Sequence, residues 1–130
     1  MKFPVYVSVV ILGSGQEDTK IGLLKTSDEL SLAGARLEEE ENSLDVALKL
    51  AKKYIGHYDE NLFFMHRGGF VDAPKRYEGA KQDIVLIYRI TVPLYTILND
   101  GMEWATTEYC NNSKQYFLKD HFDIINMAFQ

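Results

Sequence analysis

The chain is poor in cysteine, in clustered positive charge and in long apolar runs, and each shortage excludes a class of protein. Its one cysteine, Cys110, cannot form a disulfide within the chain and fits a reducing compartment. The arginines (Arg36, Arg67, Arg76 and Arg89) are scattered and the formal net charge is −5, so a surface that follows a nucleic acid backbone is not expected. No stretch is apolar for long enough to span a membrane. We therefore expect a cytoplasmic protein without a nucleic acid or membrane partner.

The length and composition predict one globular domain over residues 1–130. The N-terminal stretch MKFPVYVSVVILG has a short apolar run with an early Pro4 and no small-residue cleavage pattern, so it is not a signal peptide. Its β-branched residues predict a first strand at about 4–12 instead. Further strands are expected at about residues 21–26, 62–66 and 83–94, the first of these forming a hairpin with 4–12.

A helix is predicted from Asn42 or Ser43, either of which can cap it, to about Tyr54. Gly56 is expected to end it as a C-cap, and Lys52 and Lys53 suit the negative end of the helix dipole. One apolar stripe at helical spacing should face the core: Leu44, Ala47, Leu48, Ala51 and Ile55.

A second helix is predicted at the C-terminal end, in FLKDHFDIINMAF. We expect an irregular segment over 27–41, an exposed loop over 67–82 and a turn at Asn-Asp-Gly, 99–101. Apolar residues at helical spacing mark the core face of this helix: Leu118, Phe122, Ile125 and Phe129. The order of hairpin, helix, strands and helix predicts one α/β domain with a mixed sheet.

The segment LSLAGARLEEEENSLDVALKLAKKYIG resembles a Nudix box, whose pattern is G-x5-E-x7-R-E-U-x-E-E-x-G-U, with U a bulky aliphatic residue. Gly34 matches the first glycine of the usual lead-in, Glu41 the glutamate that ends the loop, and Gly56 the closing glycine. The resemblance implies a Nudix-type α/β/α sandwich with a mixed sheet.

Two more stretches are similar to ADP-ribose-pyrophosphatase-like and NAD-regulator-like Nudix proteins. Residues 63–93 resemble the segment with a D-P-R-type loop before a strand, and FLKDHFDII resembles the start of the last helix. The matching residues are Asp72, Pro74, Arg76, Tyr88, Trp104, Asp120 and His121. The resemblance implies a small nucleotide ligand and a homodimer. The related regulators carry a winged-helix domain, which this sequence lacks, so a stand-alone repressor is not expected.

The chain departs from the family at the residues that bind metal. Three glutamates of the box bind a divalent cation from one helix face, and their counterparts here are Leu50, Lys53 and Tyr54. Moving the alignment by one residue places Lys49, Lys52 and Lys53 there instead. We therefore expect no metal cofactor and little hydrolysis.

Three alternatives stay open from the residues alone. The run from Glu38 to Glu41 is either a solvated acidic loop or a relocated metal site, with Mg²⁺ as the cofactor of an active pyrophosphatase. Basic residues around 67–81 are either solvated or cradle a diphosphate. Tyr88 and Trp104 either stack on a base or pack in the core.

The favoured hypothesis is a Nudix-like protein that binds an ADP-ribose-like or NAD-like nucleotide without efficient hydrolysis. Substrate-binding residues are expected to be Arg36, Lys53, Arg67, Arg76, Tyr88 and Trp104, and Glu38 and Glu41 are the weak candidates for a catalytic or metal site. The third hypothesis is a protein-interaction module on a Nudix scaffold.

Overall fold

Strand β1 (Val5–Ser14) is the centre of a seven-stranded mixed sheet in the computed structural model of the chain. The structure describes residues 4–15, 18–26, 28–56, 64–72, 84–117 and 121–128, with the backbone alone for 64–72, 127 and 128. One edge of β1 pairs in parallel with β6 (Ile84–Pro93) along its whole length. The other edge pairs antiparallel first with β4 (Ala33–Arg36) and then with β2 (Thr19–Lys25). Because consecutive residues of β1 from Val7 to Gly13 are all buried, both of its faces must be covered by other layers.

The remaining strands extend this sheet on both sides. Antiparallel pairs join β5 (Phe64–Asp72) to β6, and β3 (Leu30–Ser31) and β7 (Met102–Thr106) to β2. The helices are α1 (Ser43–Tyr54), α2 (Thr107–Asn112) and α3 (His121–Ala128), with a short 3-10 helix η1 (Lys114–Tyr116) after α2. No helix in the described ranges is both long and apolar enough to cross a membrane.

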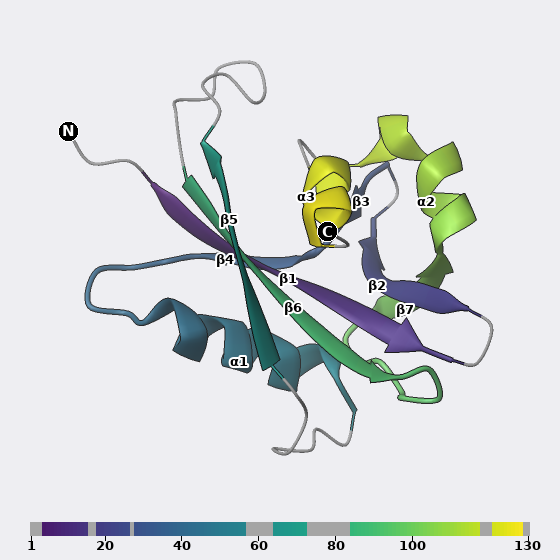
Figure 1. Cartoon of the computed structure of the whole chain (residues 1–130), viewed down its shortest axis with the longest axis horizontal. Helices are drawn as coiled ribbons and strands as arrows, with labels where there is room; N and C mark the ends of the chain where they lie inside the picture. Colours follow the sequence, from purple (N-terminus) through teal and green to yellow (C-terminus); the bar gives the residue numbers. More distant parts are fainter. Residues whose placement is uncertain are drawn as a thin grey trace.

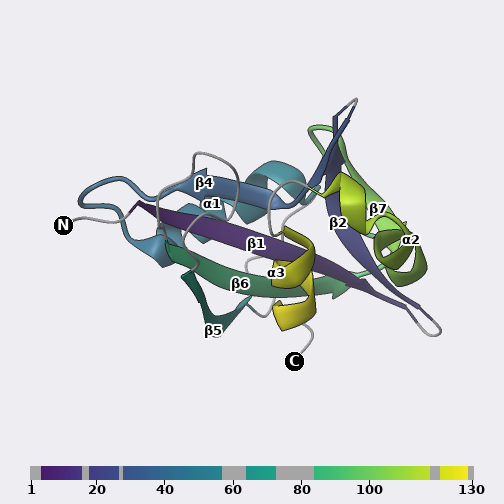
Figure 2. The ribbon, with the colours of Figure 1, turned by 90° about the horizontal axis from the view of Figure 1, so that it is seen from above.

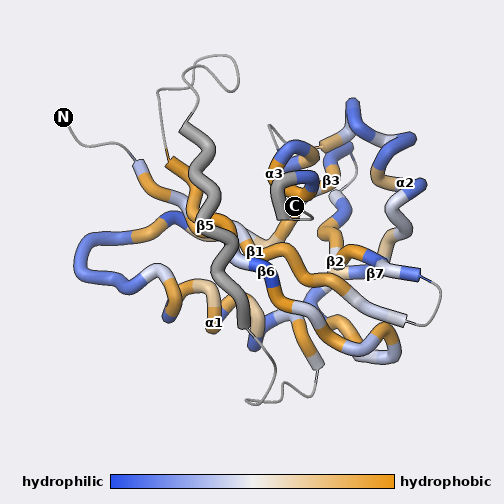
Figure 3. The backbone as a smooth tube through the Cα atoms, viewed as in Figure 1, coloured by the Kyte–Doolittle hydropathy of each residue, from blue (hydrophilic) through white to orange (hydrophobic). Residues whose placement is uncertain are grey.

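The helices lie in two layers on opposite faces of the sheet. Figure 1 shows α1 on one side of β1 and β6 and α3 on the other, and Figure 2 shows the same separation from above. Alternate residues of β1 enter two separate cores, Val9 and Ile11 beneath α1 and Val10 and Leu12 beneath α3. The tube in Figure 3 is apolar along the middle strands and hydrophilic in the loop that leads into α1. The predicted α/β/α sandwich with a mixed sheet is confirmed.

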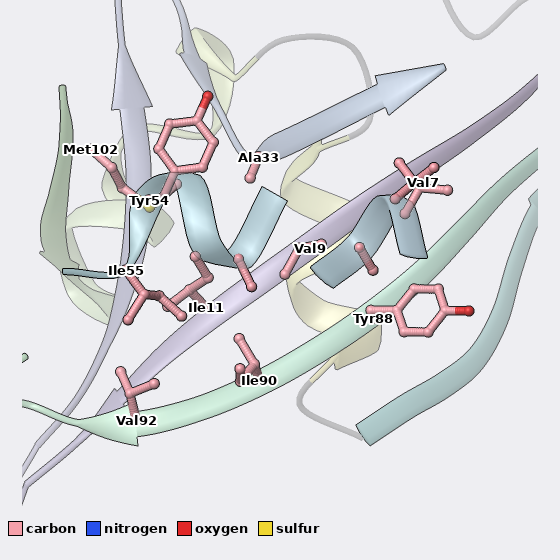
Figure 4. Packing of buried hydrophobic residues seen from close by; sticks show 13 residues of the cluster. Val7, Val9, Ile11, Ala33, Tyr54, Ile55, Tyr88, Ile90, Val92 and Met102 are labelled. Carbon is pink, nitrogen blue, oxygen red and sulfur yellow. The ribbon is translucent and has the colours of Figure 1, made fainter. Parts of the chain in front are cut away.

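Helix α1 begins as predicted, but its buried face is rotated from the expected one. The Asn42 side chain accepts hydrogen bonds from the backbone N–H groups of Leu44 and Asp45, so Asn42 is the cap. Leu44 is 44% exposed and not a core residue. The helix packs on the sheet through Val46, Ala47, Ala51 and Tyr54, which are all buried. Figure 4 shows Tyr54 among the other residues of this core. The expected stripe was wrong at Leu44, because Leu44 lies in the first turn outside the face that Val46, Ala47, Ala51 and Tyr54 form against the sheet.

Gly56 was expected to be the C-cap of the helix, and that expectation was wrong. The cap residue is Ile55 in an extended conformation, and it forms a bridge with Leu98. The backbone N–H of Gly56 donates to the carbonyl of Ile97 at 2.7 Å. A Cβ at position 56 would lie 2.8 Å from that carbonyl oxygen. Glycine is therefore needed for close approach of two backbones, not for backbone conformation.

Three segments contain structure that the sequence pattern did not predict. The segment 27–41 includes β3 and β4, and β5 continues to Asp72 into the expected exposed loop. Residues 102–117 form β7, α2 and η1. These elements are short, and their strands are fixed by pairing with distant strands, which leaves little local periodicity to read.

The predicted turn and the C-terminal helix are confirmed. Asp100 and Gly101 both have positive φ, 54° and 83°, and the N–H of Met102 donates to the carbonyl of Asn99 at 3.1 Å. In α3, Ile124 and Ile125 are buried, whereas the expected contacts of Leu118 and Phe129 lie outside the described residues. His121 at the start of α3 accepts a hydrogen bond at Nδ1 from the backbone N–H of Leu32, 3.0 Å away. This bond ties α3 to the segment between β3 and β4.

Cys110 should be unreactive in the folded protein. It is the buried residue of α2, and burial raises the pKa of its thiol from 9.0 to about 11. At this pKa only about one thiol in a thousand is ionised at pH 8. The thiolate is the form that reacts as a nucleophile, so the reaction should be slow. We expect a thiol-disulfide reagent at pH 8 to modify Cys110 at least about 100-fold more slowly in buffer than in denaturant. Equal rates in buffer and in denaturant would show that the reagent reaches Cys110 in the folded protein.

Candidate functional site

The candidate site lies around α1, where the β4–α1 loop, the helix and β6 meet. The hydroxyls of Ser43 and Tyr88 are 2.7 Å apart, so a hydrogen bond joins the first residue of α1 to β6. The two residues are 45 positions apart in sequence, and no local pattern predicts their contact. This bond fixes the start of the helix relative to the central strands.

The three residues that the sequence resemblance matches to metal-binding glutamates, Leu50, Lys53 and Tyr54, occupy the inner side and flank of α1. Tyr54 is only 7% exposed and lies in the core between α1 and the sheet (Figure 4). Leu50 is half-buried and packs against the same core. Lys53 is exposed, and its Nζ lies 5.1 Å from the centre of the Tyr54 ring. An apolar chain, an ammonium group and a buried phenol do not fit a divalent cation that requires carboxylate oxygens.

The acidic run before α1 forms a closed turn. The Oε1 atom of Glu41 accepts a hydrogen bond from the backbone N–H of Glu38 at 2.8 Å. The N–H of Glu41 donates to the carbonyl of Glu38 at 3.2 Å, and Glu40 between them has a φ of 67°. One of the two weak metal-site candidates is thus occupied in holding the loop. Within the ranges that the structure describes, no three His, Cys, Asp or Glu side chains are grouped as metal ligands.

The basic residues expected to bind phosphate are only partly placed by the structure. Arg36 is exposed at the end of β4, opposite Tyr6 of β1. Arg67 lies on β5, of which the backbone is described, and Arg76 lies outside the described residues together with the rest of the expected diphosphate loop. Of the expected cationic residues, Lys53 and Arg36 are those whose side chains can be assigned to a surface.

Tyr88 and Trp104 both pack against the core in this structure, which is one of the two alternatives that the sequence left open for them. Tyr88 is 5% exposed and belongs to the core beneath α1 (Figure 4). The indole of Trp104 packs against the same core, close to Gly13, and its Nε1–H donates to the carbonyl of Thr96 at 3.0 Å. Both rings are therefore fixed by contacts within the protein.

Comparison with solved structures identifies the fold. The chain is similar to the NUDIX domain of Shewanella oneidensis NrtR complexed with ADP ribose, with a TM-score of 0.76, 14% identity, and coverage of 99% of this chain and 88% of that one. A bifunctional NMN adenylyltransferase/ADP ribose pyrophosphatase from Francisella tularensis, complexed with AMP and a Mn ion, matches with a TM-score of 0.77 and 19% identity. That match covers 98% of this chain but 41% of the enzyme, so this chain spans less than half of the enzyme's length.

A third structure with the same fold comes from a protein complex. In the complex between the C-terminal domain of mouse MUTYH and human PCNA, the match has a TM-score of 0.73 and 14% identity, and covers 97% of this chain and 87% of that one. No family model matches the sequence, and comparison with curated proteins likewise found no match. The chain has the Nudix fold.

The buried position of Tyr54 can be tested by measuring the free energy of unfolding with urea. We expect Tyr54→Ala to lower it by about 3 kcal/mol, because the change leaves a cavity between α1 and the sheet. Tyr54→Phe keeps the ring and should change it by less than about 0.5 kcal/mol, as should the surface change Lys53→Met. A cost below about 1 kcal/mol for Tyr54→Ala would place Tyr54 outside the core and reopen this helix face as a ligand site.

Proposed function

We propose that this protein binds a nucleotide diphosphate of the ADP-ribose or NAD kind without efficient metal-dependent hydrolysis. The observation that carries the proposal is the inner side and flank of α1, where Leu50, Lys53 and Tyr54 replace the carboxylates that the fold's hydrolases use. The similarity to Nudix-fold structures that hold ADP ribose or AMP supports the class of ligand.

Hydrolysis of a diphosphate needs positive charge that offsets the charge developing on the phosphate oxygens. Carboxylates hold a divalent cation for this purpose, and α1 offers none at the three matching positions. Tyr54 cannot be turned outward to make room for a ligand, because its ring fills the core beneath the helix. The chain is therefore better suited to binding than to catalysis.

Lys53 can supply part of the missing positive charge as a fixed ammonium group. Its contact with the Tyr54 ring keeps Nζ next to the helix surface instead of extended into solvent. An ammonium group contacts phosphate as a point charge, and an arginine such as Arg36, Arg67 or Arg76 adds paired donors with fixed direction. Binding of this kind needs no metal cofactor.

We expect little release of AMP when ADP-ribose is incubated with the protein and Mg²⁺ or Mn²⁺. Turnover should stay far below about 1 s⁻¹, the low end of ordinary enzymes. Turnover at or above that rate would favour the alternative, a hydrolase that uses Glu38 and Glu41 as metal ligands. In that case the double change Glu38→Gln with Glu41→Gln should abolish the activity.

Titration calorimetry with ADP-ribose, NAD and AMP in EDTA is the direct test of binding. We expect binding that does not need metal, and Lys53→Met should weaken it about tenfold because one charge contact to phosphate is lost. Lys49→Met is the matched control, since Lys49 is an exposed lysine one turn earlier on α1 and should have little effect. The mass of the protein in solution, measured alongside, tests the implied homodimer.

Two results would contradict the binding proposal. Binding that requires Mg²⁺ would favour the hydrolase. No binding of any of these nucleotides at about 1 mM would leave a protein-interaction module as the better hypothesis.

A further inference from the structure

Two neighbouring pockets are lined by residues of β2, β7 and α2 and of the turns next to them. Figure 1 shows these three elements at the end of the molecule away from α1. One pocket, of 270 Å³, lies between the turn after β2 and Tyr116. The other, of 340 Å³, lies over β2 and β7 and includes Glu103. Lys25 and Tyr109 line both pockets, so the two form one surface groove with these residues at its middle.

The walls of the groove combine exposed aromatic rings with an excess of negative charge. Tyr109 is 40% exposed and Tyr116 is 55% exposed, so part of each ring can be reached by a ligand. Asp28 and Glu29 line the first pocket and Glu103 lines the second, against the single ammonium group of Lys25. Aromatic faces next to carboxylates favour a cationic ligand.

Lys25 shows that this surface already attracts a cation. Its Nζ lies over the Tyr109 ring, 5.9 Å from the ring centre. The ring face is therefore used by a positive charge from the chain itself. A cationic group from another molecule would compete with Lys25 for the same position.

The backbone beside the groove can accept an extended segment. Among the described strands, β7 pairs only with β2, so its other edge has no strand partner. Residues of both strands line the second pocket, Leu23 and Lys25 of β2 and Glu103 to Thr106 of β7, so it lies over this strand pair. In an extended segment every second side chain points the same way, so two such side chains can reach two neighbouring pockets.

We propose that this groove binds an extended basic segment of a partner protein, with an arginine or lysine side chain in each pocket. The carboxylates neutralise the charges and the tyrosine rings pack against the guanidinium groups or the lysine stems. The charge complementarity selects a basic partner over an acidic one. This interaction is separate from nucleotide binding at α1 and does not depend on it.

Fluorescence anisotropy tests the proposal with a labelled eight-residue peptide that alternates arginine and threonine, at roughly physiological salt. We expect saturable binding, and no binding of the peptide in which glutamate replaces arginine. The triple change Asp28→Asn, Glu29→Gln and Glu103→Gln should weaken binding about tenfold or more, and Tyr116→Ala should weaken it several-fold. These residues are exposed and the acid replacements keep side-chain shape, and unchanged urea midpoints would verify that the variants fold.

The Lys25→Met variant is the most informative test, because the sign of the ligand's charge decides whether the affinity rises or falls. If the groove takes cations, removal of the competing ammonium should strengthen peptide binding several-fold. Weaker binding of the arginine peptide by Lys25→Met would contradict the proposal.

A matched control separates this groove from the overall negative charge of the protein. The variant Glu39→Gln, Glu40→Gln and Asp45→Asn removes the same charge from exposed positions at the other end of the molecule. It should change peptide affinity by less than about twofold. An effect equal to that of the groove variant, or no binding of the arginine peptide to the unchanged protein, would overturn the proposal.

Discussion

The burial of β1 from Val7 to Gly13 is the constraint on which the rest of the structure depends. Val7, Val9 and Val10 are fully inaccessible, and alternate residues supply the floors of two separate cores. A strand buried on both faces needs a layer on each side, and one paired on both edges needs its backbone groups satisfied by neighbours. The backbone groups of β1 are paired with β6 on one edge and with β4 and β2 on the other. Helices α1 and α3 cover its two faces.

The sequence predicts those elements whose structure follows from their own residues. The continuous apolar run of β1, the capped helix α1 and the Asn-Asp-Gly turn each carry a local signal, and each is present in the structure. Strands β3, β4 and β7 are different, because the two to five residues of each are fixed by pairing with β1 or β2. A pattern of so few residues contains no reliable period, so their assignment needs the tertiary structure.

For the candidate site too, some features can be predicted from the sequence and others require the tertiary structure. Residue identity alone shows that α1 lacks carboxylates at the three matching positions. It does not show that Tyr54 is part of the core, that Lys53 lies over its ring, or that Glu41 holds its own loop. For Tyr88 the sequence left stacking and packing open, and the fold decides for packing because β6 directs alternate side chains beneath α1. Whether a side chain is buried or exposed depends on which face of its helix or strand is covered by other elements.

The fold thus presents opposite charges at two surfaces that the buried sheet separates. The exposed lysines of α1 (Lys49, Lys52 and Lys53) make the outer side of that helix positive, although the chain as a whole has a net charge of −5. The groove between β2, β7 and α2 has more carboxylates than ammonium groups. Exposed charges farther apart than about 8 Å are largely screened at physiological salt, so a ligand at one surface has little electrostatic effect at the other. Coupling between the two would therefore have to pass through the packing of β1, β2 and β6, whose side chains fill both cores and leave little room to shift.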